Sequence, residues 1–170
     1  MFDQVLGLPV QALVTHLVVV LGPLAALAAI GYAARPAWRY ALTWPTVALA
    51  VSTGVTSFVA AQSGQALEQR LLTTQAALAS RAGRLIVAHA SAGTRMRLIG
   101  LIFMVVTVVI VLWVLPATPR QRNVTDPVRR QRRSIALLAA GVLVVAGLGV
   151  LVQVTVTGHS GARAVWSGIG

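Results

Sequence analysis

The sequence predicts an all-α, polytopic membrane protein in which four transmembrane helices form a bundle. Hydrophobic residues make up 57% of the 170 residues and charged residues only 10%. The mean hydropathy is +0.82, which is too apolar for a soluble domain that covers its surface with polar groups. Four apolar runs recur along the chain, each close to the ~20 residues that an α-helix needs to cross the hydrocarbon core. Because lipid offers the backbone no hydrogen-bond partner, each run is expected to be helical even where valine is abundant.

The predicted elements form a single membrane domain, residues 1–170. The transmembrane helices cover 8–33, 41–62, 95–116 and 134–157. Residues 64–94 mix leucines with charged and amide side chains, which is typical of an amphipathic helix on the outer side between the second and third spans, where it either lies on the membrane surface or caps the bundle. A basic loop at 117–133 and an outer tail at 158–170 complete the chain.

The arginines predict the orientation in the membrane, because short cytoplasmic loops are enriched in basic residues. The loop after the first helix carries Arg35 and Arg39, and the loop after the third helix is denser still. Its arginines are Arg120, Arg122, Arg129, Arg130, Arg132 and Arg133. Both loops are therefore expected on the cytoplasmic side of a bacterial plasma membrane, with both termini outside. Beside membrane helices, the second loop is expected to contact anionic lipid and not nucleic acid.

Aromatic side chains favour the same orientation. They fall at the predicted cytoplasmic interface, where amphipathic rings prefer to lie. These residues are Tyr32, Trp38, Tyr40, Trp44 and Trp113.

Two patterns predict which helix faces meet inside the bundle. Hydroxyl residues recur on the second helix at Ser52, Thr53, Thr56 and Ser57, and Gln153 on the fourth helix is expected to find a partner in the same layer. Small residues predict close helix packing. They are Gly22, Ala25, Ala26, Ala29 and Ala33 on the first helix and Ala136, Ala140 and Gly141 on the fourth.

Three histidines, His16, His89 and His159, are the candidate ligands, and the predicted topology puts all three toward the outer face. The absence of cysteine excludes thiolate catalysis, iron–sulfur clusters and cysteine-based zinc sites. Imidazole binds haem iron, copper and zinc. One hypothesis is that these histidines hold one b-type haem, or a metal ion at the same site, for membrane electron transfer. The alternative is a non-catalytic accessory or structural subunit of a larger, respiratory-type membrane complex, or a homo-oligomer. With only three acidic residues, we expect no catalytic activity of its own.

Four segments carry a family resemblance: GLPVQALVTHLVVVLGPLAALAAI, AQSGQALEQRL, AHASAGTRMRL and TGHSGARAVWSG. Together they resemble a bacterial family of four-helix integral membrane proteins that is classified as a domain of unknown function. In that pattern the first helix begins His-Pro-x-x-x-His, the third begins with a histidine and the fourth ends in a Gly/His-rich turn. The resemblance places these histidines at His16, His89 and His159, whereas Gln11 replaces the first histidine and Ala12 the proline. It implies that a site built on the paired histidines has lost one ligand here.

Overall fold

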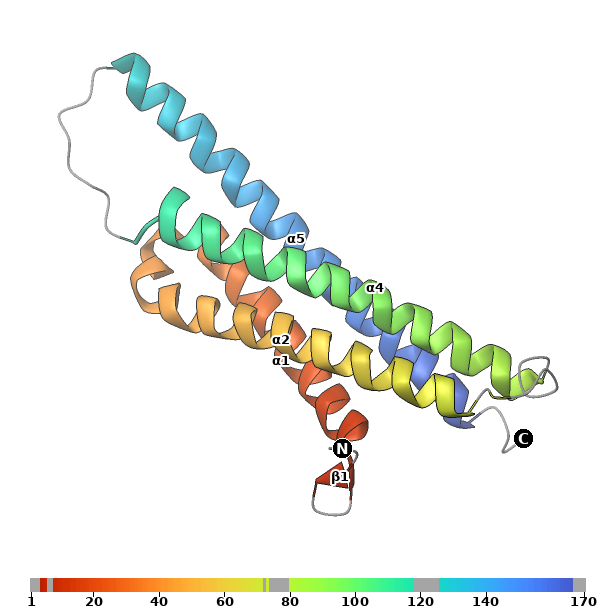
Figure 1. Ribbon diagram of the computed structural model, residues 1–170. Coiled ribbons are helices and arrows are strands. Elements are labelled where there is room, and N and C mark those ends of the chain that lie inside the picture. The colour runs from red at the N-terminus through yellow and green to blue at the C-terminus, as the bar shows by residue number, and fades with distance from the viewer. Residues whose placement is uncertain (1–3, 6–7, 72, 74–79, 118–125, 167–170) are drawn as a thin grey trace.

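The computed structural model describes the chain except for residues 1–3, 6–7, 72, 74–79, 118–125 and 167–170. Four long helices dominate it (Figure 1). They are α1 (Val10–Ala34), α2 (Arg39–Leu71), α4 (Arg81–Val109) and α5 (Asp126–Trp166). A short 3-10 helix, η1 (Pro36–Trp38), joins α1 to α2, and a π-helical turn, η2 (Ile110–Val114), extends α4. Before α1, β1 (Gln4–Val5) and β2 (Leu8–Pro9) pair as two antiparallel strands.

The predicted all-α class and the presence of four long apolar helices are confirmed. Among the described residues, four helical segments are long and apolar enough to cross a membrane. They are Val14–Ala34, Pro36–Ala66, Gly83–Val114 and Arg130–Arg163. At 1.5 Å per residue, the 41 residues of α5 extend over about 60 Å, roughly twice the thickness of a hydrocarbon core.

The outer amphipathic helix predicted at 64–94 is wrong as a separate element. Residues 64–71 form the last turns of α2, and residues 81–94 form the first turns of α4. Only glycine, at position 64, interrupts the helix-forming sequence there, so α2 continues past the predicted end at residue 62. Ser80 begins α4 as its N-cap, because its Oγ accepts the backbone N–H of Gly83 at 2.9 Å.

The predicted basic loop at 117–133 is also partly wrong, because α5 already begins at Asp126. Pro127 suits this start, since a proline in the first turn lacks only an N–H that would have no partner inside the helix. Arg130, Arg132 and Arg133 are exposed on the first turns of α5, and Arg129 lies on the same turns. Arg120 and Arg122 fall outside the described residues.

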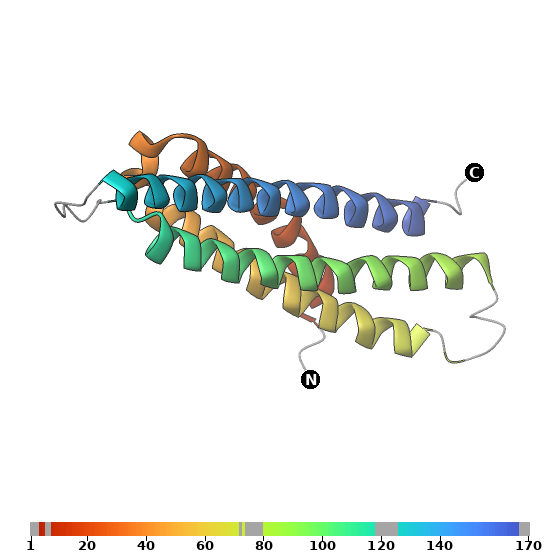
Figure 2. The same cartoon turned by 90° about the horizontal axis from the view of Figure 1, so that it is seen from above.

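The four helices form a ring in the order α1, α2, α4, α5, each contacting the next and α5 closing on α1. The α1–α2 and α4–α5 connections lie at one end of the bundle, here called the arginine end. The other end, which carries the start of α4 and the end of α5, is called the histidine end. In Figure 2, α2, α4 and α5 run side by side, while α1 crosses them and its first turns leave the bundle partway along, short of the ends of the other three helices.

Glycines bring neighbouring helices close together. A Cβ on Gly100 of α4 would lie 2.8 Å from the Oγ of Ser57 on α2. Likewise, a Cβ on Gly147 of α5 would lie 3.2 Å from the carbonyl oxygen of Ala26 on α1. The small-residue face predicted on α1 is confirmed, since Ala25, Ala26 and Ala29 are fully buried. The prediction for Gly141 is wrong, because this glycine is exposed and Gly147 makes the close approach instead.

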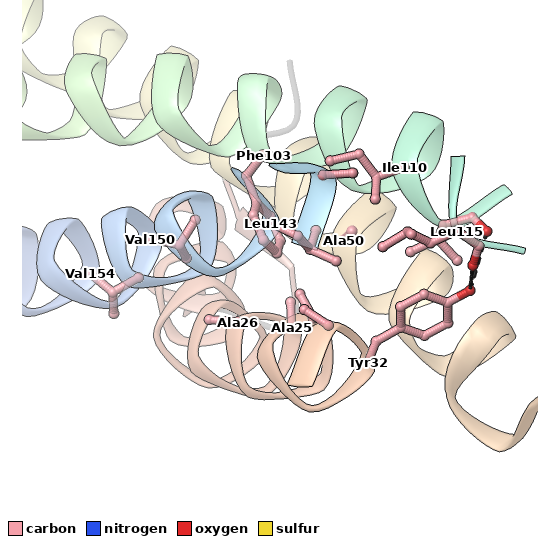
Figure 3. Close-up of a cluster of buried hydrophobic side chains, with 14 of the residues drawn as sticks. Ala25, Ala26, Tyr32, Ala50, Phe103, Ile110, Leu115, Leu143, Val150 and Val154 are labelled. Carbon is pink, nitrogen blue, oxygen red and sulfur yellow. Dashed lines mark hydrogen bonds between the residues drawn. The ribbon is translucent and has the colours of Figure 1, made fainter. Parts of the chain in front are cut away.

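The core lies along the axis of this ring (Figure 3). Phe103 of α4 and Leu143 of α5 are large, fully buried members of it, and Val150 continues it toward the histidine end. Alanines of α1 and Ala50 of α2 oppose them. The bulky side chains of α4 and α5 thus fill the space that the small residues of α1 leave.

The interfacial role predicted for Tyr32 is wrong, because its side chain is fully buried. Its hydroxyl donates to the carbonyl oxygen of Leu115, just beyond η2, and lies 3.3 Å from that of Val111 (Figure 3). The end of a helix leaves carbonyl groups without intrahelical partners, so Tyr32 caps this end from a neighbouring helix. The other predicted belt residues are exposed around the arginine end: Trp38, Tyr40, Trp44 and Trp113.

Candidate ligand-binding cavity

The fold brings the three histidines to one end of the bundle, as the sequence predicts. His16 lies in the second turn of α1, His89 in the third turn of α4 and His159 in the last turns of α5. α4 starts at the histidine end and α5 finishes there, and Thr15, next to His16 on α1, lines a cavity together with His89.

The imidazoles do not gather into one group, however. His89 is half-buried between the helices, whereas the side chains of His16 and His159 are exposed. Within the part of the chain that the structure describes, no three His, Cys, Asp or Glu side chains come together in a way that could hold a metal ion. The structure therefore places one of the three predicted ligands, His89, at an internal site.

That site is a cavity of about 150 Å³ at the histidine end. All four helices line it, and most of the lining is apolar. Its polar side chains are Thr15 of α1, Ser57 and Glu68 of α2, His89 of α4 and Thr157 of α5. No arginine occurs among the described residues that line it.

Small residues at helical spacing create this cavity. On α2 the lining residues Ser57, Ala61, Gly64 and Glu68 follow one face over about three turns. On α4, Ala90 and Gly93 follow the His89 face, and a Cβ on Gly93 would meet no atom within 4 Å. The cavity is therefore extended along the bundle, from Ser57 at its deep end to Glu68 near the end of α2.

The deep end of the cavity contains an unsatisfied polar atom. Ser57 is 1% exposed, and its Oγ has no hydrogen-bond partner among the described residues. Thr53, one turn deeper, is also fully buried, and its Oγ1 likewise has no hydrogen-bond partner among the described residues. The prediction that this face of α2 turns toward other helices is confirmed, and Thr56 beside it donates instead to the carbonyl oxygen of Ser52 at 2.7 Å.

Below His89, the buried amide of Gln153 joins α5 to α4. Its Nε2 donates to the carbonyl oxygen of Ala92 at 3.1 Å and to the Oγ1 of Thr157 at 3.2 Å. The predicted partner inside the bundle is thus confirmed. Since unsatisfied amides are costly to bury, these bonds fix the depth at which α4 and α5 meet.

One turn further out, His89 itself contacts α5. Its Nδ1 lies 3.1 Å from the Oγ of Ser160, and a Cβ on Gly161 would lie 3.1 Å from its Cε1. The imidazole therefore lies close to α5, and a side chain at position 161 would require the ring to shift by a few tenths of an ångström.

Sequence reasoning did not select Glu68, Ser57, Ser160 or Gly161 as site residues. A signal for one of them was present, because Gln153, Thr157 and Ser160 recur at i, i+4 and i+7 and so share one face of a helix. Glu68 lies within the segment predicted to form a separate outer amphipathic helix. Its place in the cavity depends on the continuation of α2 beyond residue 62.

Comparison with known proteins identifies no relative. No protein-family model, no curated protein and no solved structure matches the chain. The family resemblance and the haem or metal hypothesis stay predictions. Of the residues named for such a group, His89 is the one that reaches the cavity, and Glu68 is the other described lining residue able to ligate a metal.

Proposed function

We propose that this protein is an integral protein of the bacterial plasma membrane that binds a compact amphipathic molecule between its helices. The observation that carries the proposal is the cavity of about 150 Å³ that all four helices line, with His89 and Glu68 set into otherwise mostly apolar walls. Ligand sites commonly combine an apolar lining with a few polar groups that orient the ligand.

The size of the cavity limits the ligand. A cavity of about this volume can hold one benzene-sized molecule, and ordinary drug-sized ligands occupy roughly 300–1,000 Å³. Ligands the size of one aromatic ring, or a short chain of similar volume, therefore fit best. A haem macrocycle would need space beyond this cavity, so the geometry favours a small organic molecule over the predicted haem.

The position of the cavity favours an amphipathic ligand. Arg97 donates to the Oε1 of Gln62 at 3.3 Å, and these polar residues bound the apolar runs of α4 and α2 on the outer side. Ser57 lies on the membrane side of this level, whereas Glu68 and His89 lie beyond it. A ligand would thus place its apolar part at the level of the lipid and its polar group near the water.

A cavity-filling variant tests the proposal. Gly93→Leu adds a side chain to the lining at a position where a Cβ meets no atom. Gly141→Leu is its matched control, because a Cβ there also meets no atom but the residue is exposed on α5. Both changes remove a helical glycine, so their effects on helix propensity are similar.

The measurement is the thermal unfolding of the protein in lipid nanodiscs, with and without para-cresol. Binding to the folded state raises stability with ligand concentration, so para-cresol should raise the midpoint for the parent and for Gly141→Leu but not for Gly93→Leu. Equal midpoint shifts in all three proteins would exclude the cavity as the site. No shift in any of them would count against this class of ligand.

The finer topology is part of the proposal, with both termini on the outer side. A reporter that is active only in the periplasm should be active when fused after Gly170 and inactive when fused at Asn123. The opposite pattern would put the histidine end in the cytoplasm, and the cavity would then receive its ligand from that side.

A further inference from the structure

The hydroxyl of Ser160 determines which nitrogen of the His89 ring donates a hydrogen bond and which accepts one. Its Oγ donates to the carbonyl oxygen of Thr157 at 2.8 Å and lies 3.1 Å from the Nδ1 of His89. A serine hydroxyl has one hydrogen to donate, and a carbonyl oxygen can only accept. The Ser160 hydrogen is therefore used toward Thr157, which leaves an oxygen lone pair for Nδ1. The 3.1 Å separation is also within the usual range of an N–H···O bond.

We infer that His89 is held as the Nδ1–H tautomer, that its Nε2 is a hydrogen-bond acceptor, and that the ligand carries a neutral hydroxyl donor, as an alcohol or a phenol does. The inference rests on the proposed function and names the ligand class for the same cavity. In a neutral imidazole one ring nitrogen donates and the other accepts, so a proton fixed on Nδ1 leaves a lone pair on Nε2.

The placement of the ring supports this assignment. His89 lines the cavity, whereas Ser160 and Gly161 do not, so the Nδ1–Cε1 edge lies against α5. A Cβ on Gly161 would lie 3.1 Å from Cε1, 3.4 Å from Nδ1 and 3.8 Å from Nε2. Of the two nitrogens, Nε2 is therefore the farther from a Cβ at position 161 of α5.

The remaining lining explains why a neutral donor is preferred. The ionised form of Glu68 would add only acceptors, and no described arginine lines the cavity to attract an anion. The Oγ1 of Thr157 already accepts a hydrogen bond from the Nε2 of Gln153 at 3.2 Å. A cation would have to leave water for mostly apolar walls, whereas a hydroxyl loses less and still satisfies Nε2.

The tautomer can be observed directly by nitrogen NMR of the full chain in nanodiscs with ¹⁵N-labelled histidine. His89→Gln assigns the resonance, since the chain has only three histidines. The expected spectrum shows a protonated Nδ1 and an unprotonated Nε2 at His89. Adding para-cresol should shift the Nε2 resonance, and toluene should not. An unprotonated Nδ1 in the ligand-free protein would overturn the inference.

The affinities of para-cresol and its methyl ether test the ligand class. The ether has the same ring and lacks the donor, so it should bind about tenfold more weakly, since a buried acceptor is left without its partner. Ser160→Ala removes the group that holds the proton on Nδ1, and the preference for cresol should fall to about twofold or less. Ser91→Ala is the control, because this exposed serine donates to the carbonyl oxygen of Ala88 at 2.8 Å and does not line the cavity, and it should keep the full preference.

The outcomes separate this inference from the proposed function. If cresol, its ether and toluene bind equally well, the cavity stands as a site and the donor preference is wrong. If benzylamine binds more tightly than cresol, the ligand is a cation and the inference is again overturned. If none of them binds, the proposed function itself fails for ring-sized ligands.

Discussion

Tyr32 of α1 donates its hydroxyl hydrogen to the carbonyl oxygen of Leu115, 83 residues further along the chain. This bond ties the end of the first span to the residue that follows η2. Because both groups are buried, neither can turn to water if the other is lost.

Replacement of this tyrosine by phenylalanine should therefore destabilise the bundle. Tyr32→Phe keeps the ring but leaves a buried carbonyl without its donor, at a cost of about 1–3 kcal/mol in the free energy of unfolding. Chemical or thermal unfolding in nanodiscs measures this. Tyr40→Phe is the control, since Tyr40 is 83% exposed, and its change should be close to zero. Equal losses in the two variants would contradict the role assigned to Tyr32.

Gly100 should not tolerate even a methyl group. A Cβ there would lie 2.8 Å from the Oγ and 3.0 Å from the Cβ of Ser57, so the Ser57 side chain would have to move or α2 and α4 would have to separate. We expect Gly100→Ala to destabilise the protein by about 1–3 kcal/mol. Gly141→Ala, at an open position, should instead stabilise it by up to about 1 kcal/mol through helix propensity.

A double variant checks the cause of this effect. Ser57→Ala removes the nearer of the two atoms that Gly100→Ala would meet. The combination should therefore be less destabilising than the sum of the two single changes. Simple additivity would show that the strain lies elsewhere.

Removal of the Thr107 hydroxyl should have the opposite effect and stabilise the protein. It is fully buried on α4, and its Oγ1 has no hydrogen-bond partner among the described residues. Thr107→Val has nearly the same shape and should raise the free energy of unfolding by about 1 kcal/mol. Thr56→Val provides the comparison, because the Oγ1 of Thr56 donates to Ser52. We expect no gain there.

The first turns of α5 should bind anionic lipid. Arg130, Arg132 and Arg133 are exposed there, and cations near the membrane surface contribute about 1 kcal/mol each to such binding. The triple change to glutamine should reduce the retention of phosphatidylglycerol over phosphatidylcholine, measured by native mass spectrometry. Arg163→Gln at the histidine end is the control. A similar reduction from this single change would argue against a lipid site at the arginine end.

Sequence alone could predict the spans and which end of the bundle carries the histidines. Length and hydropathy define the spans, and helix direction then fixes the depth of His16, His89 and His159. The inward face of α2 was also predictable, because Thr53 and Ser57 are one turn apart and costly to expose to lipid.

Packing details were beyond the sequence pattern. Gly141 and Gly147 are both glycines on the same apolar helix, and only the crossing of α1 and α5 decides that Gly147 meets Ala26. The sequence position of Tyr32 predicts an interfacial aromatic, and only the structure shows that its hydroxyl donates to the carbonyl oxygen of Leu115. The cavity could not be predicted either. It depends on where α2 ends and on which small residues of different helices face one another.

The uninterrupted course of α5 links the two ends of the molecule mechanically. Arg130 and Ser160 belong to one helix, about 45 Å apart at 1.5 Å per residue. If these arginines bind anionic headgroups as predicted above, a rotation of α5 about its axis there would also turn the Ser160 hydroxyl that faces His89.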